Sequence, residues 1–207
     1  MIRLLSVLVA IVLFFIWLAP DNHTSIEHTP RVLPIAASLA TPIQKEAQNT
    51  QPFQIKEYTL QPKAEIHLAA RLLGKERYRL GRESDLSPMD LALGWGAMAN
   101  PQVTEQIQIS QSGRWFHWKT DKLPIPRREI ERNAANMHII PANQTVEKQL
   151  SRIEEGDIIQ LSGQLVDIQS QDGYFWRTSM SREDIGAGAC EIIYTTHIDI
   201  VPASSYN

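Results

Sequence analysis

The sequence predicts an α+β fold made mostly of antiparallel strands. They would form a small curved sheet or a partly open barrel with two short helices, preceded by one hydrophobic N-terminal helix. Apolar and polar side chains alternate in several segments, which indicates strands with one buried face. These segments are residues 66–72, 103–110, 157–168 and 191–201. Turn sequences at 111–114 and 171–173 predict hairpins, which make antiparallel neighbours.

Residues 1–19 predict a membrane anchor or a signal segment. Arg3 is the only charge, and residues 4–18 are apolar apart from Ser6. A helix of this length spans about 22 Å, less than the roughly 30 Å of a bilayer core, which favours a cleaved signal. No small-x-small cleavage site follows at the expected distance, which favours an uncleaved anchor. We expect the anchor, a single pass of the inner membrane with the N-terminus cytoplasmic and the C-terminal domain periplasmic or otherwise extracytoplasmic.

Residues 20–52 predict a semi-extended linker. They hold five of the twelve prolines, and neither the helical nor the strand period survives there. We place a single extracytoplasmic globular domain at 53–207. The length of 207 residues suits one domain with an anchor and a linker.

The segment 80–100 is the most informative part of the chain. Ser87-Pro88-Met89-Asp90 has the residues of a helix start, with Ser as the cap, Pro in the first turn and Asp at the positive end. Gly94 is a suitable helix stop. Trp95 stands between two glycines, and its indole either stacks on a ligand or fills the core.

The remaining elements are predicted from the spacing of apolar residues and from the glycines and turn residues between them. The clearest helix has Val146, Leu150 and Ile153 on one side and ends at Gly156, and Gly163 indicates a bulge or bend. The expected elements are strand 115–120, a helical turn at 127–133, helix 143–155 and strand 174–180. The strand after Gly156 and the hairpin that follows resemble, in shape, an oligonucleotide- or oligosaccharide-binding barrel.

Composition excludes several classes of site. A formal charge of −3 and a pI near 6.1 argue against non-specific nucleic-acid binding. The single cysteine forms no internal disulfide. The histidines lack the spacing of metal ligands, and the chain has neither a Gly-rich phosphate loop nor a Gly-x-Ser-x-Gly elbow. We therefore expect no metal and no cofactor.

Several short motifs resemble those of a family of uncharacterised bacterial proteins. They are the SPxDLxLGWG segment from Ser87 to Gly96, Ile109-Ser110-Gln111 to Trp115, Asn136-Met137-His138 and Cys190-Glu191. Members of that family share an N-terminal hydrophobic segment and a domain of this size, and the likeness covers roughly residues 57–201. The resemblance implies one domain of the bacterial envelope and no particular activity.

Cys190 and His138 form the sharpest candidate for catalysis. A cysteine nucleophile needs a neighbouring base, and an imidazole within hydrogen-bond reach provides one. Asn136 or Asp184 would orient the ring. Cys190 at the start of a strand also suits a small buried hydrophobic residue, and we prefer this alternative.

A binding surface is the other candidate site. We assign to it Trp95, Asp90, Arg182 and Asp184. Arg182 lies in a glycine-containing loop beside Cys190, where it would grip an anionic ligand or pair with an acidic residue. Asp90 would serve the helix start, which leaves acid–base work as its less favoured use.

The preferred function is a non-enzymatic binding or accessory module of the bacterial envelope. Its partners would be the membrane, through residues 1–19, and a protein or envelope component. The alternative is a thiol-dependent hydrolase or transferase that uses Cys190 and His138. A weaker alternative is a glycan- or oligonucleotide-binding barrel, although the acidity of the chain counts against nucleic acid.

Overall fold

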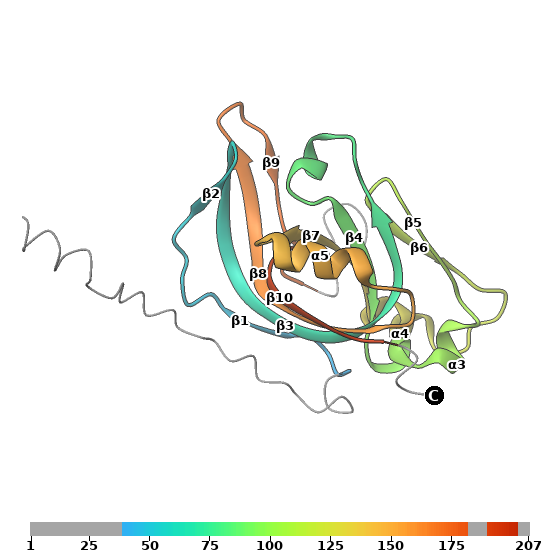
Figure 1. The fold of residues 1–207 in the computed structure, drawn as a ribbon. Helices are drawn as coiled ribbons and strands as arrows, with labels where there is room; N and C mark the ends of the chain where they lie inside the picture. Colours follow the sequence, from blue (N-terminus) through green and yellow to red (C-terminus); the bar gives the residue numbers. More distant parts are fainter. Residues whose placement is uncertain (1–38, 182–189, 203–207) are drawn as a thin grey trace, which may run out of the picture. The chain divides into compact units, whose positions relative to one another are not determined.

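Five strands form a closed circuit of hydrogen-bonded neighbours in the computed structural model, which describes residues 39–181 and 190–202 (Figure 1). The circuit runs β3–β4–β7–β10–β8 and returns to β3. Its members are β3 (Tyr58–Arg77), β4 (Met89–Gly94), β7 (Ala134–Pro141), β8 (Ile158–Ser170) and β10 (Glu191–Val201). The β7–β10 pair is parallel and the other four pairs are antiparallel. The predicted mostly antiparallel β fold is therefore confirmed.

Shorter elements are attached to this barrel. β1 (Ile43–Glu46) and β2 (Phe53–Ile55) pair with β3, β9 (Phe175–Trp176) pairs with β8, and β5 (Gln108–Ser112) and β6 (Trp115–Lys119) form a separate hairpin. The α-helices are α3 (Pro101–Thr104), α4 (Arg127–Arg132) and α5 (Gln144–Arg152); the 3-10 turns are η1 (Arg82–Asp85) and η2 (Gly96–Ala99). β1 thus brings into the sheet residues that the sequence analysis assigns to the linker.

Within residues 39–181 and 190–202, no helix is both long and apolar enough to cross a membrane. The hydrophobic helix predicted at 1–19 lies outside these ranges, and so do Arg182 and Asp184.

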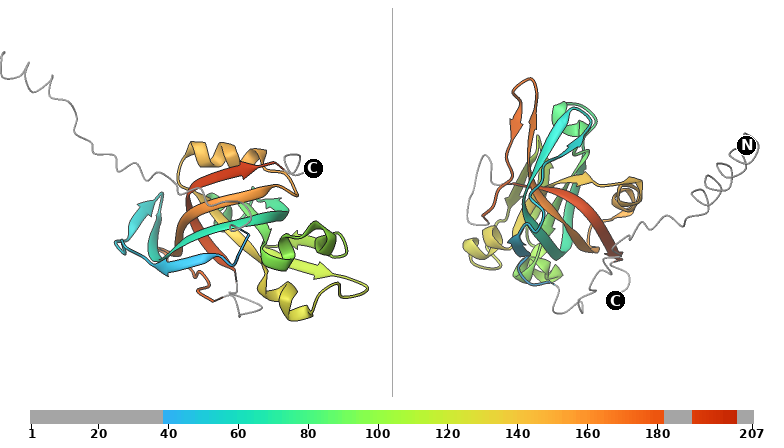
Figure 2. Two further views of the ribbon diagram at one scale, coloured as in Figure 1. Left: turned by 90° about the horizontal axis from the view of Figure 1, so that it is seen from below. Right: turned by 90° about the vertical axis from the view of Figure 1, so that its left-hand side faces the viewer.

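Alternate residues of each barrel strand face the interior. Leu91, Met137, Ile139 and Ile193 belong to the largest core cluster, whereas Ile140 and Ile192 belong to a second cluster on the outer side of the wall. α5 packs along β10 and adds Val146 and Leu150 to the interior (Figure 2). Its cap is Asn143, whose side chain accepts hydrogen bonds from the backbone N–H groups of Thr145 and Val146. The predicted helix is confirmed.

The helix start predicted at Ser87–Asp90 is wrong, because the chain forms β4 from Met89 onward. All six residues of β4 are buried, and β4 pairs with β3 on one edge and β7 on the other. Two-sided pairing and burial outweigh the local preference of a cap-like sequence. Gly94 permits close packing instead of ending a helix: a Cβ there would lie 2.4 Å from the carbonyl oxygen of Met98.

Two other strands are shorter than predicted. Asn100 caps α3 with Pro101 in its first turn, so the strand expected at 103–110 begins only at Gln108. The return strand expected at 174–180 is reduced to the two residues of β9. The irregularity predicted at Gly163 is confirmed, because the register of β10 shifts beside it, between Thr195 and His197. Only glycine fits there, since a Cβ would lie 2.2 Å from the carbonyl oxygen of Tyr194.

Candidate functional site

A polar cluster occupies the outer side of the barrel wall where β4 pairs with β7. Asp90 and His138 lie directly opposite each other in the β4–β7 register. Asn136 is two residues from His138 and shares its face, whereas the intervening Met137 points into the core. The residues that meet here, called the Asp90 cluster below, are Tyr78, Ser87, Asp90, Gln111, Arg114, Asn136, His138 and Trp176.

The Asp90 carboxylate is the centre of the cluster. It is fully buried. Oδ1 accepts a hydrogen bond from Arg114 Nη1 at 2.7 Å, and Oδ2 accepts one from Asn136 Nδ2 at 3.1 Å. His138 Nδ1 lies 2.9 Å from the same Oδ1. A buried carboxylate requires such partners, because desolvation without them is very costly.

Arg114 reaches Asp90 from the tip of the β5–β6 hairpin. Gly113 and Arg114 both have positive φ, 56° and 72°, which makes the tight turn that carries the guanidinium to β4. The guanidinium carbon lies 3.9 Å from the ring centroid of Tyr78 and 5.8 Å from that of Trp176. The backbone N–H of Arg114 also donates to the Tyr78 hydroxyl at 2.9 Å. Two aromatic rings and one carboxylate thus hold this side chain in place.

Tyr78 and Asn136 support these contacts. Burial raises the pKa of Tyr78 above its usual value, so the phenol stays neutral beside the guanidinium. Asn136 donates through Nδ2 to Asp90 and to the carbonyl oxygen of Arg114, and its Oδ1 accepts from Gln111 Nε2 at 2.7 Å. Asn136 therefore orients Asp90 and the hairpin. The side chain that lies against the His138 ring nitrogen is Asp90.

The two nitrogens of His138 differ in their surroundings. Nδ1 is completely buried and lies 2.9 Å from Asp90 Oδ1 without an aligned hydrogen bond. Nε2 is not among the fully buried polar atoms without a partner, and no residue in the described ranges bonds to it. The ring also packs against Trp176, with centroids 4.8 Å apart. Nε2 is the nitrogen that a ligand or a nucleophile would reach.

Cys190 lies close to this face along the sheet. It is half-buried and directly precedes β10, where Glu191 is in parallel register with Met137. Its carbonyl oxygen accepts a hydrogen bond from the backbone N–H of Ser179 at 3.1 Å. Between the described residues Cys190 and His138 the structure has no hydrogen bond. It therefore places the predicted catalytic residues on neighbouring strands, and their joint role stays a prediction.

Of the four predicted binding residues, the structure describes two, Trp95 and Asp90. Trp95 is 1% exposed and packs in the barrel core, so its indole fills the interior and offers no surface for stacking. Asp90 is central, but as a buried ion-pair partner and not as a helix cap. Arg182 and Asp184 lie outside the described residues. Sequence reasoning missed Arg114 and Trp176, and the only signal was the turn that sets Arg114 at a hairpin tip.

A second cluster joins the β3–β4 connection to the turn after β8. Arg82 pairs with Asp172 at 2.7 Å and donates to the Ser170 hydroxyl, and its guanidinium carbon lies 4.3 Å from the ring centroid of Tyr174 and 5.5 Å from that of Tyr58. These five residues are called the Arg82 cluster below. Hydrogen bonding from Arg82, then from Ser170, holds the pKa of Asp172 well below its usual value. The cluster fastens two loops that flank the β4–β7 face.

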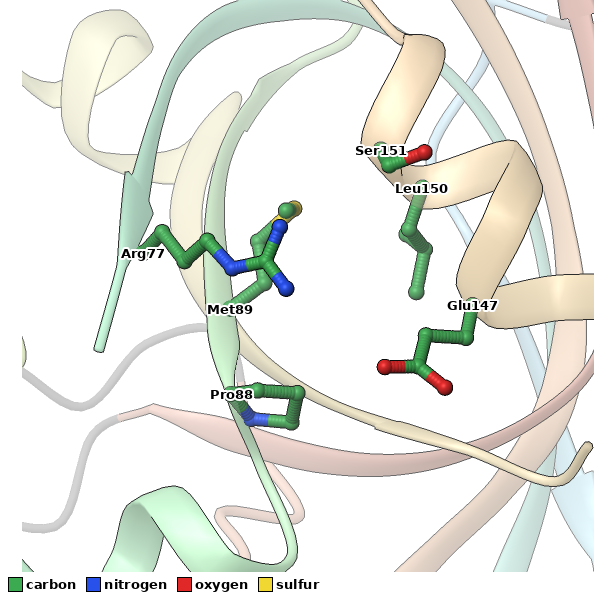
Figure 3. A pocket seen from close by; sticks show the side chains of 6 residues that line it. All are labelled: Arg77, Pro88, Met89, Glu147, Leu150 and Ser151. Atoms are coloured by element: carbon green, nitrogen blue, oxygen red, sulfur yellow. The ribbon is translucent and has the colours of Figure 1, made fainter. Parts of the chain in front are cut away.

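No group of three or more His, Cys, Asp or Glu residues within 39–181 and 190–202 is arranged to hold a metal ion. A shallow depression of about 10 Å³ lies between α5 and the β3 and β4 strands, where Arg77 and Glu147 extend toward each other (Figure 3). It has room for about one water molecule. Its other lining residues are Pro88, Met89, Leu150 and Ser151. The Asp90 cluster is therefore the better candidate for a site.

Comparison of the chain with protein-family models, with curated proteins and with solved structures gives no match.

Proposed function

We propose that the barrel is a non-enzymatic binding module of the bacterial envelope, anchored through residues 1–19 with the barrel outside the cytoplasm. It binds a partner protein or envelope component on the β4–β7 face. One observation carries the proposal: side chains from two barrel strands, the β3–β4 connection, the β5–β6 hairpin and β9 converge on Asp90. A surface assembled from so many separate segments is typical of a recognition site on a rigid scaffold.

The strand order supports this choice of face. The circuit β3–β4–β7–β10–β8 has the strand order of an oligonucleotide/oligosaccharide-binding barrel. As in such barrels, the helix, here α5, lies between the strands that come third and fourth along the chain, β7 and β8. In such barrels ligands lie on the face of the second and third strands and on the loops beside it. Here those strands are β4 and β7. The loops beside them carry Tyr78 and Trp176, and the acidity of the chain favours a protein or glycan ligand over nucleic acid.

Three exposed apolar residues lie next to members of the Asp90 cluster in the sequence, or two positions away, and would provide contact area. Trp115 adjoins Arg114 and is 43% exposed, Phe175 adjoins Trp176 and is 48% exposed, and Leu80 lies two residues from Tyr78. Aromatic side chains and arginine are enriched at protein-binding surfaces.

Site-specific photo-crosslinking tests the proposal. A photoreactive phenylalanine analogue replaces Phe175 or Trp115 in the full-length chain within its native membrane, and the control position is Lys148 on the exposed side of α5. We expect the same adduct from both face positions and none from Lys148. Equal adducts from all three positions, or none from the face, would contradict the proposal.

A thiol-dependent transferase or hydrolase is the second candidate. The observation that favours it is the Asp90 oxygen 2.9 Å from His138 Nδ1, because a carboxylate at Nδ1 is what orients a catalytic imidazole whose Nε2 serves a nucleophile. Cys190 would be that nucleophile. The test is the alkylation rate of Cys190 against pH in the folded full-length chain.

The two candidates predict different alkylation profiles. Catalysis requires fast reaction with an apparent thiol pKa well below about 8.5 that moves in His138→Gln. The binding module predicts a thiol that reacts at the same rate in His138→Gln as in the unmodified chain, with crosslinking unchanged in Cys190→Ala.

A further inference from the structure

We infer that Arg114, with His138 beside it, binds an oxyanion carried by the ligand, a carboxylate or a phosphate group. The inference rests on the proposed function and names the chemistry recognised at that site. Arg114, in the turn of the β5–β6 hairpin, and His138, on β7, contact the same oxygen of Asp90, at 2.7 Å and 2.9 Å. Both also pack against the Trp176 ring. One carboxylate and one indole therefore hold two potential ligand-binding groups side by side.

The guanidinium of Arg114 has one edge occupied and one edge open. Nη1 donates to Asp90 Oδ1 and lies 3.4 Å from the Ser87 hydroxyl. Nε and Nη2 have no hydrogen-bond partner among the residues that the structure describes. Neither atom is among the fully buried polar atoms without a partner, and the side chain is 17% exposed, so solvent reaches this edge. The Nε–Nη2 edge is a planar pair of donors that matches two oxygens of a carboxylate or phosphate.

His138 is the second group: its side chain is 5% exposed, and Nε2 is the ring nitrogen that is not among the fully buried polar atoms without a partner. With a proton on Nδ1 facing Asp90, a neutral ring presents a lone pair at Nε2, which accepts a hydrogen bond from a hydroxyl of the ligand. A protonated ring presents an N–H there, which donates to the oxyanion itself. In either state Nε2 would give the ligand a second polar contact, in addition to that of Arg114.

The site is organised before the ligand arrives. Tyr78 lies 3.9 Å from the guanidinium carbon, and its hydroxyl holds the backbone of Arg114. Fixing a long side chain in advance removes part of the entropy cost of binding. Asp90 occupies Nη1 of the guanidinium, which leaves the Nε and Nη2 donors for the ligand. A planar, prearranged donor pair then selects oxyanions over neutral groups.

Arginine side-chain NMR on the full-length chain in detergent tests the inference. Acetate and inorganic phosphate are titrated separately at constant ionic strength while the Nε–Hε signals are followed. We expect the Arg114 signal to shift and saturate, and the probe with the lower midpoint identifies the oxyanion class. Arg127, a surface arginine paired with Glu131, is the internal control and should not shift. No shift of Arg114, or equal shifts of both signals, overturns the inference.

Variants sharpen the result. Arg114→Lys keeps the charge but loses the planar edge, and we expect about a tenfold or larger loss of probe affinity, measured by the shift of the His138 ring signals. Arg127→Lys should leave the affinity unchanged. Unchanged affinity in Arg114→Lys overturns the inference without relying on the Arg114 signal.

The crosslinking experiment separates this inference from the proposed function. Crosslinks from Phe175 that weaken in Arg114→Lys support both. If crosslinks persist at full strength in a folded Arg114→Lys chain, the binding face is supported. The inference that this face recognises an oxyanion is then overturned. Absence of crosslinks in the unmodified chain overturns the proposed function, and the NMR titration then still decides whether Arg114 binds an oxyanion.

Discussion

The Asp90 cluster and the Arg82 cluster are built from the same chemical parts. Each has an arginine 2.7 Å from an aspartate oxygen, and each guanidinium lies against two aromatic rings. Each also joins segments that are distant in the sequence. They differ in exposure: the Asp172 side chain is 61% exposed, whereas that of Asp90 is completely buried.

This difference separates two uses of one motif. Water and salt screen the Arg82–Asp172 pair, so it contributes little energy and serves to fasten two loops. The Arg114–Asp90 pair is screened far less, and neither partner is tolerated there without the other. The two pairs differ in burial and not in the identity of the charged residues, and only the buried pair is the centre of the candidate site.

The largest expected effect is that of Asp90→Ala. Removing it leaves the Arg114 guanidinium and the His138 ring without their shared partner, and loss of one member of a buried pair costs about 3–5 kcal/mol. Chemical denaturation of the full-length chain measures the free energy of unfolding. Asp172→Ala is the matched control and should cost much less. Equal losses from the two variants would show that burial does not distinguish the clusters.

A double variant should recover part of the stability lost when Arg114 is removed. Arg114→Met alone leaves the Asp90 carboxylate buried without its cation. Adding Asp90→Asn removes that charge, and we expect a favourable coupling of about 2 kcal/mol from the unfolding free energies of the four chains. Simple additivity of the two single losses would mean that the pair is not coupled. The corresponding Arg82–Asp172 cycle should be close to additive.

Trp176→Ala is expected to cost less, because the ring supports Arg114 and His138 without carrying charge. Loss of a partly buried cation–π contact costs about 1 kcal/mol, in addition to the lost packing area. The more specific readout is the order of the Arg114 Nε–Hε group by NMR relaxation, which should fall. Tyr174→Ala should leave the Arg114 group ordered while it loosens Arg82. The same change at Arg114 in both variants would contradict the separation of the clusters.

The smallest effect is an acid response confined to the Arg82 cluster. The Asp172 carboxyl has a pKa lowered from the ordinary 3.8 by hydrogen bonding from Arg82. A lowered pKa contributes stability above the unfolded-state value, and this contribution is lost as pH falls below it toward the folded-state pKa. We expect faster amide exchange at Arg82 and Tyr174 only below about pH 4. Asp172→Asn should show the fast exchange already at pH 6, and a pH-dependent onset in that variant would contradict this origin.

The sequence predicts those parts of the barrel that have one apolar face. Ile159, Leu161 and Leu165 alternate along β8 because every second residue enters the core. Asn143 and the apolar positions of α5 likewise indicate a helix through local chemistry alone. His138 stands out in the sequence because it interrupts an apolar run, and it does lie at the candidate site.

The parts that escaped prediction depend on distant partners. Ser87–Asp90 has the local composition of a helix cap, but strands from both sides of β4 decide its conformation. Asp90 and Arg114 are 24 residues apart, and only the sheet register and the hairpin tip bring them together. Trp176 reaches the cluster from β9, which the sequence indicates only as part of a longer strand. No local sequence pattern indicates which distant residues come into contact.

Closure of the barrel also sets an order of events during folding. Tyr58 near the start of β3 pairs with Ser170 at the end of β8, and β10 enters between β7 and β8. Hydrogen bonding of the circuit is therefore incomplete until the residues up to Val201 are available to pair. Until then β7 and β8 keep unpaired edges, which are prone to join strands of other chains. Long-range pairing of this kind also folds slowly, so the newly made chain has an extended period of vulnerability to aggregation.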